Sequence, residues 1–264
     1  MSRTASGTRS SSADPRKPTP LRQITSFTRE LLFVIVGAII VSSLLRMFVG
    51  QMFIIPSQSM ENTLLKGDRV VVEKITDFER GDVVVFADPG GWLDGATVEE
   101  RGPVGKAFEL IGVLPDTSTG HLIKRVIGLP GDRVMCCDDK GRLTVNGQPL
   151  DEAQYLYRDS GGEQIEPSTT DFEVVVPKDH LFVMGDHRDL SADSRCHLSD
   201  LWPDLPKGGI AFVPTDLVVG PAFAIAAPFD RAQRLRDPAT FASVPDPSAP
   251  APAEAVIKPK DVTC

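Results

Sequence analysis

The feature that most constrains this chain is an apolar run without a single charge, Leu31–Leu45 (LLFVIVGAIIVSSLL). Arg46 interrupts the run, and Met47–Val49 extends the apolar stretch to nineteen residues. A helix needs about 20 apolar residues to cross a bilayer. Eleven of the first fifteen are Leu, Ile, Val or Phe, which favour insertion, and an arginine near a helix end costs less than a central one. The run therefore predicts a single membrane-spanning anchor over residues 29–50.

The residues before this anchor indicate its orientation. Residues 1–30 hold six basic and two acidic residues, a net charge of +4, whereas the whole chain carries −8. Positively charged flanks stay in the cytoplasm, so we expect the chain beyond residue 50 on the other side. A cleaved signal peptide is the alternative, but no small-x-small cleavage site follows the run. Residues 1–28 are rich in Ser, Thr, Pro and Arg, which predicts a disordered cytoplasmic tail.

The remainder predicts an antiparallel β domain over residues 51–232. Its short runs of β-branched and apolar residues are Val70–Val72, Val83–Phe86, Leu143–Val145, Phe172–Val176 and Leu181–Met184. Asn146-Gly147 follows the third run and is the strongest two-residue hairpin signal. Residues 87–120 are rich in Gly, Pro and acidic residues, so we expect a long insertion loop. Residues 233–264 are rich in Pro and Ala and predict a disordered tail.

Charge and motif content argue against several functions. Beyond residue 30 the chain carries −12, whereas nucleic-acid binding needs clustered Lys and Arg. The sequence has no G-x-S-x-G, H-E-x-x-H or G-x-G-x-x-G, so we expect neither a metal nor a cofactor. Adjacent Cys136 and Cys137 cannot easily ligate one zinc together with Cys196 and His197. We expect a disulfide between Cys196 and either Cys136 or Cys137, because the exported side permits oxidation.

Three segments place hydroxyl and lysine side chains on backbone that is punctuated by Gly and Pro. They are Ile55–Leu64 (IPSQSMENTL), Ile123–Asp132 (IKRVIGLPGD) and Met184–Arg195 (MGDHRDLSADSR). With Gly67–Val70 (GDRV), this ordered set resembles the bacterial type I signal peptidases, or leader peptidases, over about residues 30–230. The insertion and the His of Gly-Asp-His-Arg look like the actinobacterial branch. The resemblance implies a mainly antiparallel β catalytic domain with a small inserted β cap, here at about residues 136–180.

The resemblance assigns a role to individual residues, position by position. The nucleophile falls on Ser59 and the general base on Lys124. Ser57 matches the serine whose hydroxyl, with the Ser59 backbone N–H, stabilises the oxyanion. Ser191 matches the hydroxyl that hydrogen-bonds the lysine amine. Departures from the common pattern, such as Asn62 in place of Pro, do not touch this dyad.

Further residues are expected around the dyad. Asp193 and Arg195 match a structural ion pair beside it. An extended substrate could pair with strand edges at residues 55–57 and 122–124, and small pockets there would admit Ala-sized side chains. The expected substrate-binding residues are Ile55, Pro56, Met60, Leu122 and Ile123.

Elementary chemistry agrees with these assignments. A serine hydroxyl is a weak nucleophile until a base takes its proton. An exposed lysine is protonated at pH 7, but burial can lower its pKa by up to about 3–5 units. Lys124 follows Leu122 and Ile123, which could line an apolar pocket. A histidine base, His187 or His197, is the alternative; His187 stands where the family commonly has Asn, so it is not a required base.

The sequence therefore predicts a membrane-anchored serine endopeptidase that removes signal peptides from exported preproteins. We expect it in the cell membrane, with its N-terminus in the cytoplasm and its catalytic domain outside. Its expected partners are preprotein signal peptides, lipids of the cytoplasmic membrane and, by proximity, the secretion translocon. One alternative is a catalytically silent, membrane-tethered β domain that acts as a secretion scaffold. A self-cleaving Ser/Lys repressor would need a DNA-binding helix-turn-helix in place of the apolar run.

Overall fold

The computed structural model describes residues 29–42, 50–93, 102 and 120–258, which fall into two compact units divided after Ser42. In the first unit, residues 29–42 form an α-helix. Within the described ranges, no helix has both the length and the apolar character that crossing a membrane requires. Part of the predicted anchor, residues 43–49, lies outside the described residues, and Gly50 already begins the first strand.

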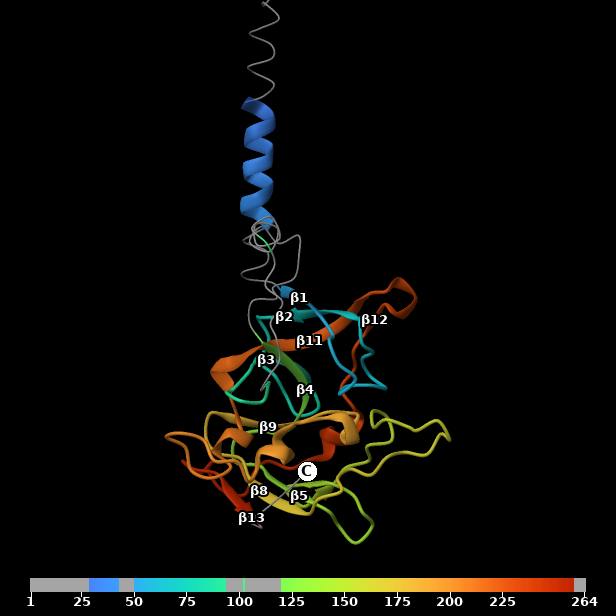
Figure 1. Ribbon diagram of the computed structural model, residues 1–264, viewed down its shortest axis with the longest axis vertical. Helices are drawn as coiled ribbons and strands as arrows, with labels where there is room; N and C mark the ends of the chain where they lie inside the picture. Colours follow the sequence, from blue (N-terminus) through green and yellow to red (C-terminus); the bar gives the residue numbers. More distant parts are fainter. Residues whose placement is uncertain (1–28, 43–49, 94–101, 103–119, 259–264) are drawn as a thin grey trace, which may run out of the picture. The chain divides into compact units, whose positions relative to one another are not determined.

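The strands of the described second unit form two antiparallel sheets, which confirms the mainly β, antiparallel part of the predicted fold class (Figure 1). In the first sheet the strand order is β1-β2-β11-β3-β4-β9-β10, with β12 paired to β11. Its strands are β1 (Gly50–Ile54), β2 (Arg69–Glu73), β3 (Val83–Ala87), β4 (His121–Gly128), β9 (His180–Met184), β10 (Val213–Pro214), β11 (Val218–Ala227) and β12 (Gln233–Arg234). The valine runs form β2 and β3 because branched side chains pack well on a pleated surface.

A second sheet follows β4 along the chain. Its order is β13-β8-β5-β6-β7, formed by β5 (Arg133–Cys136), β6 (Thr144–Val145), β7 (Gln148–Pro149), β8 (Phe172–Val175) and β13 (Val256–Lys258). Asn146 and Gly147 connect β6 to β7 with φ values of +53° and +80°. Two consecutive positive φ values are typical of a type I′ turn, so the hairpin signal is confirmed. Four of the five strands come from residues 133–175, which overlap the predicted cap.

Short 3-10 helices complete the described elements. They are η1 (Arg188–Leu190), η2 (Ser194–His197), η3 (Gly209–Ala211), η4 (Thr215–Leu217), η5 (Phe229–Arg231) and η6 (Ala239–Ser243). The first two follow β9 directly and carry part of the third motif segment.

Strand β4 lies where three apolar clusters meet. Its Ile123 belongs to the cluster beneath β1 and β2, and its Val126 to one beneath β3 and β9. Its Ile127 belongs to the largest cluster, which also contains Phe182 of β9 and Phe172 of the second sheet. A strand fixed on several sides by packing presents its remaining side chains in defined positions.

The disordered tail that the sequence predicts from residue 233 is wrong over residues 233–258. Phe241 and Val244 are buried in the largest cluster, and β13 pairs with β8. The Thr240 hydroxyl accepts a hydrogen bond from the Asp151 N–H at 2.7 Å. A few apolar anchors are enough to order this proline-rich segment, because each proline lacks a backbone N–H and so leaves fewer hydrogen-bond donors to be satisfied. Residues 259–264 lie outside the described residues.

The expected disulfide between Cys196 and Cys136 or Cys137 is also wrong. Cys136 and Cys137 are bonded to each other. Cys136 ends β5, where its pairing with Phe172 turns it into the core of the second sheet. Neither cysteine is therefore available to Cys196.

Packing of residues 233–258 can be tested at Phe241. We expect Phe241→Leu to lower the free energy of unfolding by roughly 1–2 kcal/mol, because the smaller side chain leaves a cavity in the cluster. Phe229, which is 91% exposed, is the matched control, and Phe229→Leu should change stability by less than about 0.5 kcal/mol. Urea denaturation of the full chain in detergent measures both; equal effects would contradict the packing.

Candidate active site

The turn between β1 and β2 holds Ser59. The Ile55 N–H donates to the Asp68 carbonyl at 2.9 Å, and the Leu64 N–H donates to the Met60 carbonyl at 2.7 Å. Asn62 takes a φ of +89° while its side-chain amide donates to the Leu156 carbonyl at 3.1 Å. Ser59 itself is buried, with 4% of its surface exposed. The turn therefore presents the serine to the protein interior.

Strand β4 brings Lys124 to this serine. Lys124 pairs with Val84 of β3, and 4% of its surface is exposed. Its Nζ donates a hydrogen bond to the Ser59 Oγ at 2.6 Å. The fold thus joins two side chains that are 65 positions apart in the sequence.

Burial makes this amine unusually easy to deprotonate. Removal of Lys124 from water lowers its pKa from 10.5 to about 8, because the charged form loses its hydration. The carboxylates of Asp193 and Asp186 act in the opposite direction, and the Arg195 guanidinium adds to the lowering. A free amine next to a serine hydroxyl can accept the hydroxyl proton, so the pair has the parts of a nucleophile and its base.

The two other serines behave differently from each other. The Ser57 hydroxyl donates to the Ser59 Oγ at 3.3 Å, so Ser57 lies next to the candidate nucleophile. The hydrogen bond expected between Ser191 and the Lys124 amine is not formed. Among the described residues the buried Ser191 hydroxyl has no hydrogen-bond partner, because the amine is directed at Ser59.

Gly185 explains how the third motif segment can approach so closely. A Cβ at this position would overlap both the Ser191 side chain and the Ser59 carbonyl oxygen. The Gly185 N–H donates to the Asp193 carboxylate at 2.9 Å. Only glycine fits between these groups.

Asp193 and Arg195 form a buried ion pair beside the dyad. The Arg195 guanidinium donates two hydrogen bonds to the Asp193 carboxylate, both at 2.9 Å. It also donates to the Arg188 carbonyl at 2.9 Å. Such a planar, two-point contact fixes orientation as well as charge.

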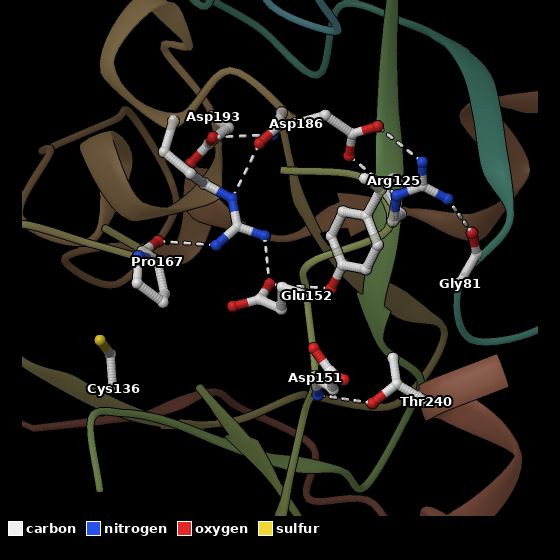
Figure 2. A network of polar contacts seen from close by, with 12 residues as sticks. Gly81, Arg125, Cys136, Asp151, Glu152, Pro167, Asp186, Asp193 and Thr240 are labelled. Atoms are coloured by element: carbon white, nitrogen blue, oxygen red, sulfur yellow. Dashed lines mark hydrogen bonds and ion pairs between the residues drawn. The ribbon is translucent and has the colours of Figure 1, made fainter. Parts of the chain in front are cut away.

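A larger buried network surrounds this pair, and Figure 2 shows its main members. Arg125, next to Lys124, donates to both oxygens of Asp186 at 2.8 and 2.6 Å and to the Gly81 carbonyl at 2.6 Å. Arg188 donates to Glu152 at 2.5 Å, and the same Glu152 oxygen accepts from the Tyr155 hydroxyl at 2.8 Å. Each buried charge has an opposite partner, as the cost of burying a lone charge requires.

Sequence reasoning assigned no role to this network. Arg125, Asp186 and Arg188 stand inside the motif segments, so their positions could have drawn attention to them. Glu152 and Tyr155 belong to no motif, and only the fold brings them to Arg188.

The expected substrate-binding residues differ in exposure. Ile55, Met60 and Ile123 are buried together in one apolar cluster. Pro56 is exposed and Leu122 is half-buried. In the register between β4 and β9 the first pair is Arg125 and Met184. Within the described strands, the β4 segment 121–124 therefore pairs only with β3.

The two candidate histidine bases make other contacts. The His187 ring stacks on Tyr157 at 3.8 Å, and its Nδ1 lies 3.3 Å from Glu61 Oε2. The His197 Nδ1 lies 2.7 Å from Asp200 Oδ2, and its ring stacks on Trp92. Of the side chains described, those with a hydrogen bond to the Ser59 hydroxyl are Lys124 and Ser57. No group of three or more His, Cys, Asp or Glu among the described residues could hold a metal ion.

Comparison with known proteins decides the family. A family model described as "Signal peptidase, peptidase S26" matches residues 28–227, which include every motif segment. The chain belongs to the S26 signal peptidase family. It is therefore a hydrolase of peptide bonds, as the sequence predicts.

Several S26 relatives are similar over most of their length. A signal peptidase I of Mycobacterium tuberculosis is 36% identical over 242 residues, covering 84% of this chain and 79% of the relative. A probable signal peptidase I of Mycobacterium leprae is 35% identical over 215 residues, covering 70% of this chain and 71% of the relative. A signal peptidase I P of Bacillus subtilis subsp. natto is 32% identical over 185 residues, covering 68% and 84%.

Proposed function

We propose that this S26 peptidase removes signal peptides from exported preproteins, with Ser59 as nucleophile and Lys124 as general base. The observation that carries the assignment is the buried Lys124 amine, 2.6 Å from the Ser59 hydroxyl. The lowered pKa of Lys124, about 8, leaves a useful fraction of free amine near neutral pH.

In this mechanism the free Lys124 amine takes the Ser59 proton as the Ser59 oxygen attacks the scissile carbonyl. The negative charge that develops on the carbonyl oxygen would be stabilised by the Ser57 hydroxyl and the Ser59 N–H. The protonated lysine then returns its proton to the leaving amine. A water molecule, activated by the same amine, releases the acyl group from Ser59. Asp193 and Arg195 would keep the neighbouring backbone in place.

The substrate would bind as an extended strand. The β4 segment 121–124 has an edge without a β partner among the described strands, and residues 55–57 follow β1 outside the strand. A peptide between them could pair by main-chain hydrogen bonds. Ile55, Met60 and Ile123 pack closely, which would leave room only for small side chains.

A membrane anchor would serve this reaction directly. The charge-free run 31–45 and the positive residues before it support a single span over 29–50 with the N-terminus in the cytoplasm. The catalytic domain would then lie at the outer face, close to lipids and to the translocon. Confinement to the surface where cleavage sites emerge raises the effective concentration of substrate.

The dependence of activity on pH tests the base. We expect kcat/KM for preprotein cleavage to rise about tenfold per pH unit below pH 8 and to level off above it, because only the free Lys124 amine accepts a proton. The measurement is cleavage of a purified preprotein by the full chain in detergent between pH 6 and 9.5. A midpoint near 6.5 would instead indicate a histidine base.

A further inference from the structure

Two side chains outside the proposed dyad meet beside Ser59. Glu61 follows the serine by two positions on the same turn, whereas His187 comes from the third motif segment. The backbone N–H of His187 donates to the backbone carbonyl of Ser59 at 3.1 Å, so the two segments touch at the candidate nucleophile itself. Neither side chain has a role in the mechanism above.

The His187 ring is buried against Tyr157 on one face and lies near Glu61 at its edge. It is 7% exposed and stacks on Tyr157 with an interplanar angle of 16°. Its Nδ1 lies 3.3 Å from Glu61 Oε2, and this nitrogen has no hydrogen-bond partner within the part of the chain that the structure describes. When Nδ1 carries a proton, the ring and the carboxylate attract each other, and a buried setting strengthens that attraction.

Glu61 extends this contact to the residue before the nucleophile. The same Oε2 atom accepts a hydrogen bond from the Gln58 side-chain amide at 3.1 Å. The Glu61 N–H donates to the Gln58 carbonyl at 3.0 Å. Residues 58 and 61, which bracket Ser59, are therefore tied to each other and to His187.

We propose that Glu61 and His187 form a positioning pair that holds the nucleophile turn so that the Ser59 hydroxyl faces Lys124. The inference rests on the proposed function, because it concerns the reactivity of Ser59. The pair touches neither the scissile bond nor the lysine amine, so it acts only through the turn. Displacement of a nucleophile by a fraction of an ångström lowers its reactivity without lowering substrate affinity.

A double-mutant cycle tests the pair. We expect Glu61→Ala and His187→Ala each to lower kcat about three- to tenfold with KM changed less than twofold. The double variant should lose no more than either single variant, since both remove the same contact. His187→Asn should recover most of the rate, because the Asn amide nitrogen can occupy the place of Nδ1. Glu163→Ala and His180→Ala, outside this cluster, are the matched controls.

The proposal fails if the two losses add, if Glu61→Ala keeps the full kcat, or if His187→Asn is as slow as His187→Ala. Thermal unfolding of each variant shows whether it is folded; should His187→Ala not fold, the His187→Asn and Glu61→Ala results decide. A second readout is the rate at which p-nitrophenyl acetate acylates Ser59, followed by intact mass. This rate requires no preprotein. A chain that cleaves no preprotein but shows the same coupling in acylation would contradict the proposed function and leave the positioning pair supported.

Discussion

Replacement of either Ser59 or Lys124 by alanine is expected to abolish preprotein cleavage. Each variant removes one half of a unit in which the amine activates the hydroxyl, so kcat/KM should fall by about 10⁴-fold or more. Lys124→Arg should be equally inactive, because a guanidinium stays protonated and cannot accept the serine proton. The measurement is cleavage of one purified preprotein by the full-length variants under identical conditions.

Three further variants make this result specific. Ser57→Ala should retain residual activity, since loss of one oxyanion donor typically costs about 10²–10³ in rate. Lys66, which is exposed, provides the control for lysine removal, and Lys66→Ala should cleave at the wild-type rate. An active Lys124→Ala enzyme would refute the dyad, and so would a folded but inactive His187→Asn enzyme.

Local sequence patterns predicted the sheet elements well because their causes are local. The valine runs became β2 and β3, and the Asn146-Gly147 pair became the turn between β6 and β7. Each of these patterns depends on neighbouring residues alone. The order of strands in the sheet depends on contacts between distant segments, which no local pattern contains.

Composition misled the prediction for residues 233–258. The many prolines and alanines there suggested disorder, yet a few residues decide the outcome. Phe241 is buried in the main core, and Val256–Lys258 completes the edge of the second sheet. An average over a segment hides such anchors, whose partners lie about 80 to 90 residues earlier in the chain.

In the candidate site, too, the features that depend on local sequence could be predicted, whereas those that depend on contacts between distant segments could not. Sequence reasoning could pair Ser59 with Lys124 because both motif segments are intact, and the structure brings these two side chains together. The Ser191 hydroxyl does not make the expected hydrogen bond to Lys124, and its position close to Gly185 depends on the path of the backbone between β9 and η2. The partnership of Glu152 with Arg188 joins residues 36 positions apart, and no motif contains both.

Burial of Lys124, which would suit it to the proposed role of base, also lowers the stability of the folded chain. The surroundings that lower its pKa to about 8 do so by making its charged form unfavourable in the folded chain. The unfolded chain, where the pKa is 10.5, binds that proton more readily. At pH 7 the buried, protonated lysine therefore lowers the free energy of unfolding of the enzyme.

Lys124→Met should consequently produce an inactive protein that is more stable than the enzyme. The pKa difference between 10.5 and about 8 corresponds to about 3 kcal/mol at pH 7. This gain is fully present below pH 8, falls as the pH rises towards 10.5, and should be about 1 kcal/mol at pH 10. Urea denaturation of both full-length proteins in detergent at pH 7 and pH 10 measures this gain in the free energy of unfolding. Lys66, which is exposed, provides the control, and Lys66→Met should change stability by less than about 0.5 kcal/mol at either pH. A Lys124→Met protein that is no more stable than the enzyme at pH 7 would show that burial does not disfavour the charged form of Lys124. A gain in stability that is equal at both pH values would show the same.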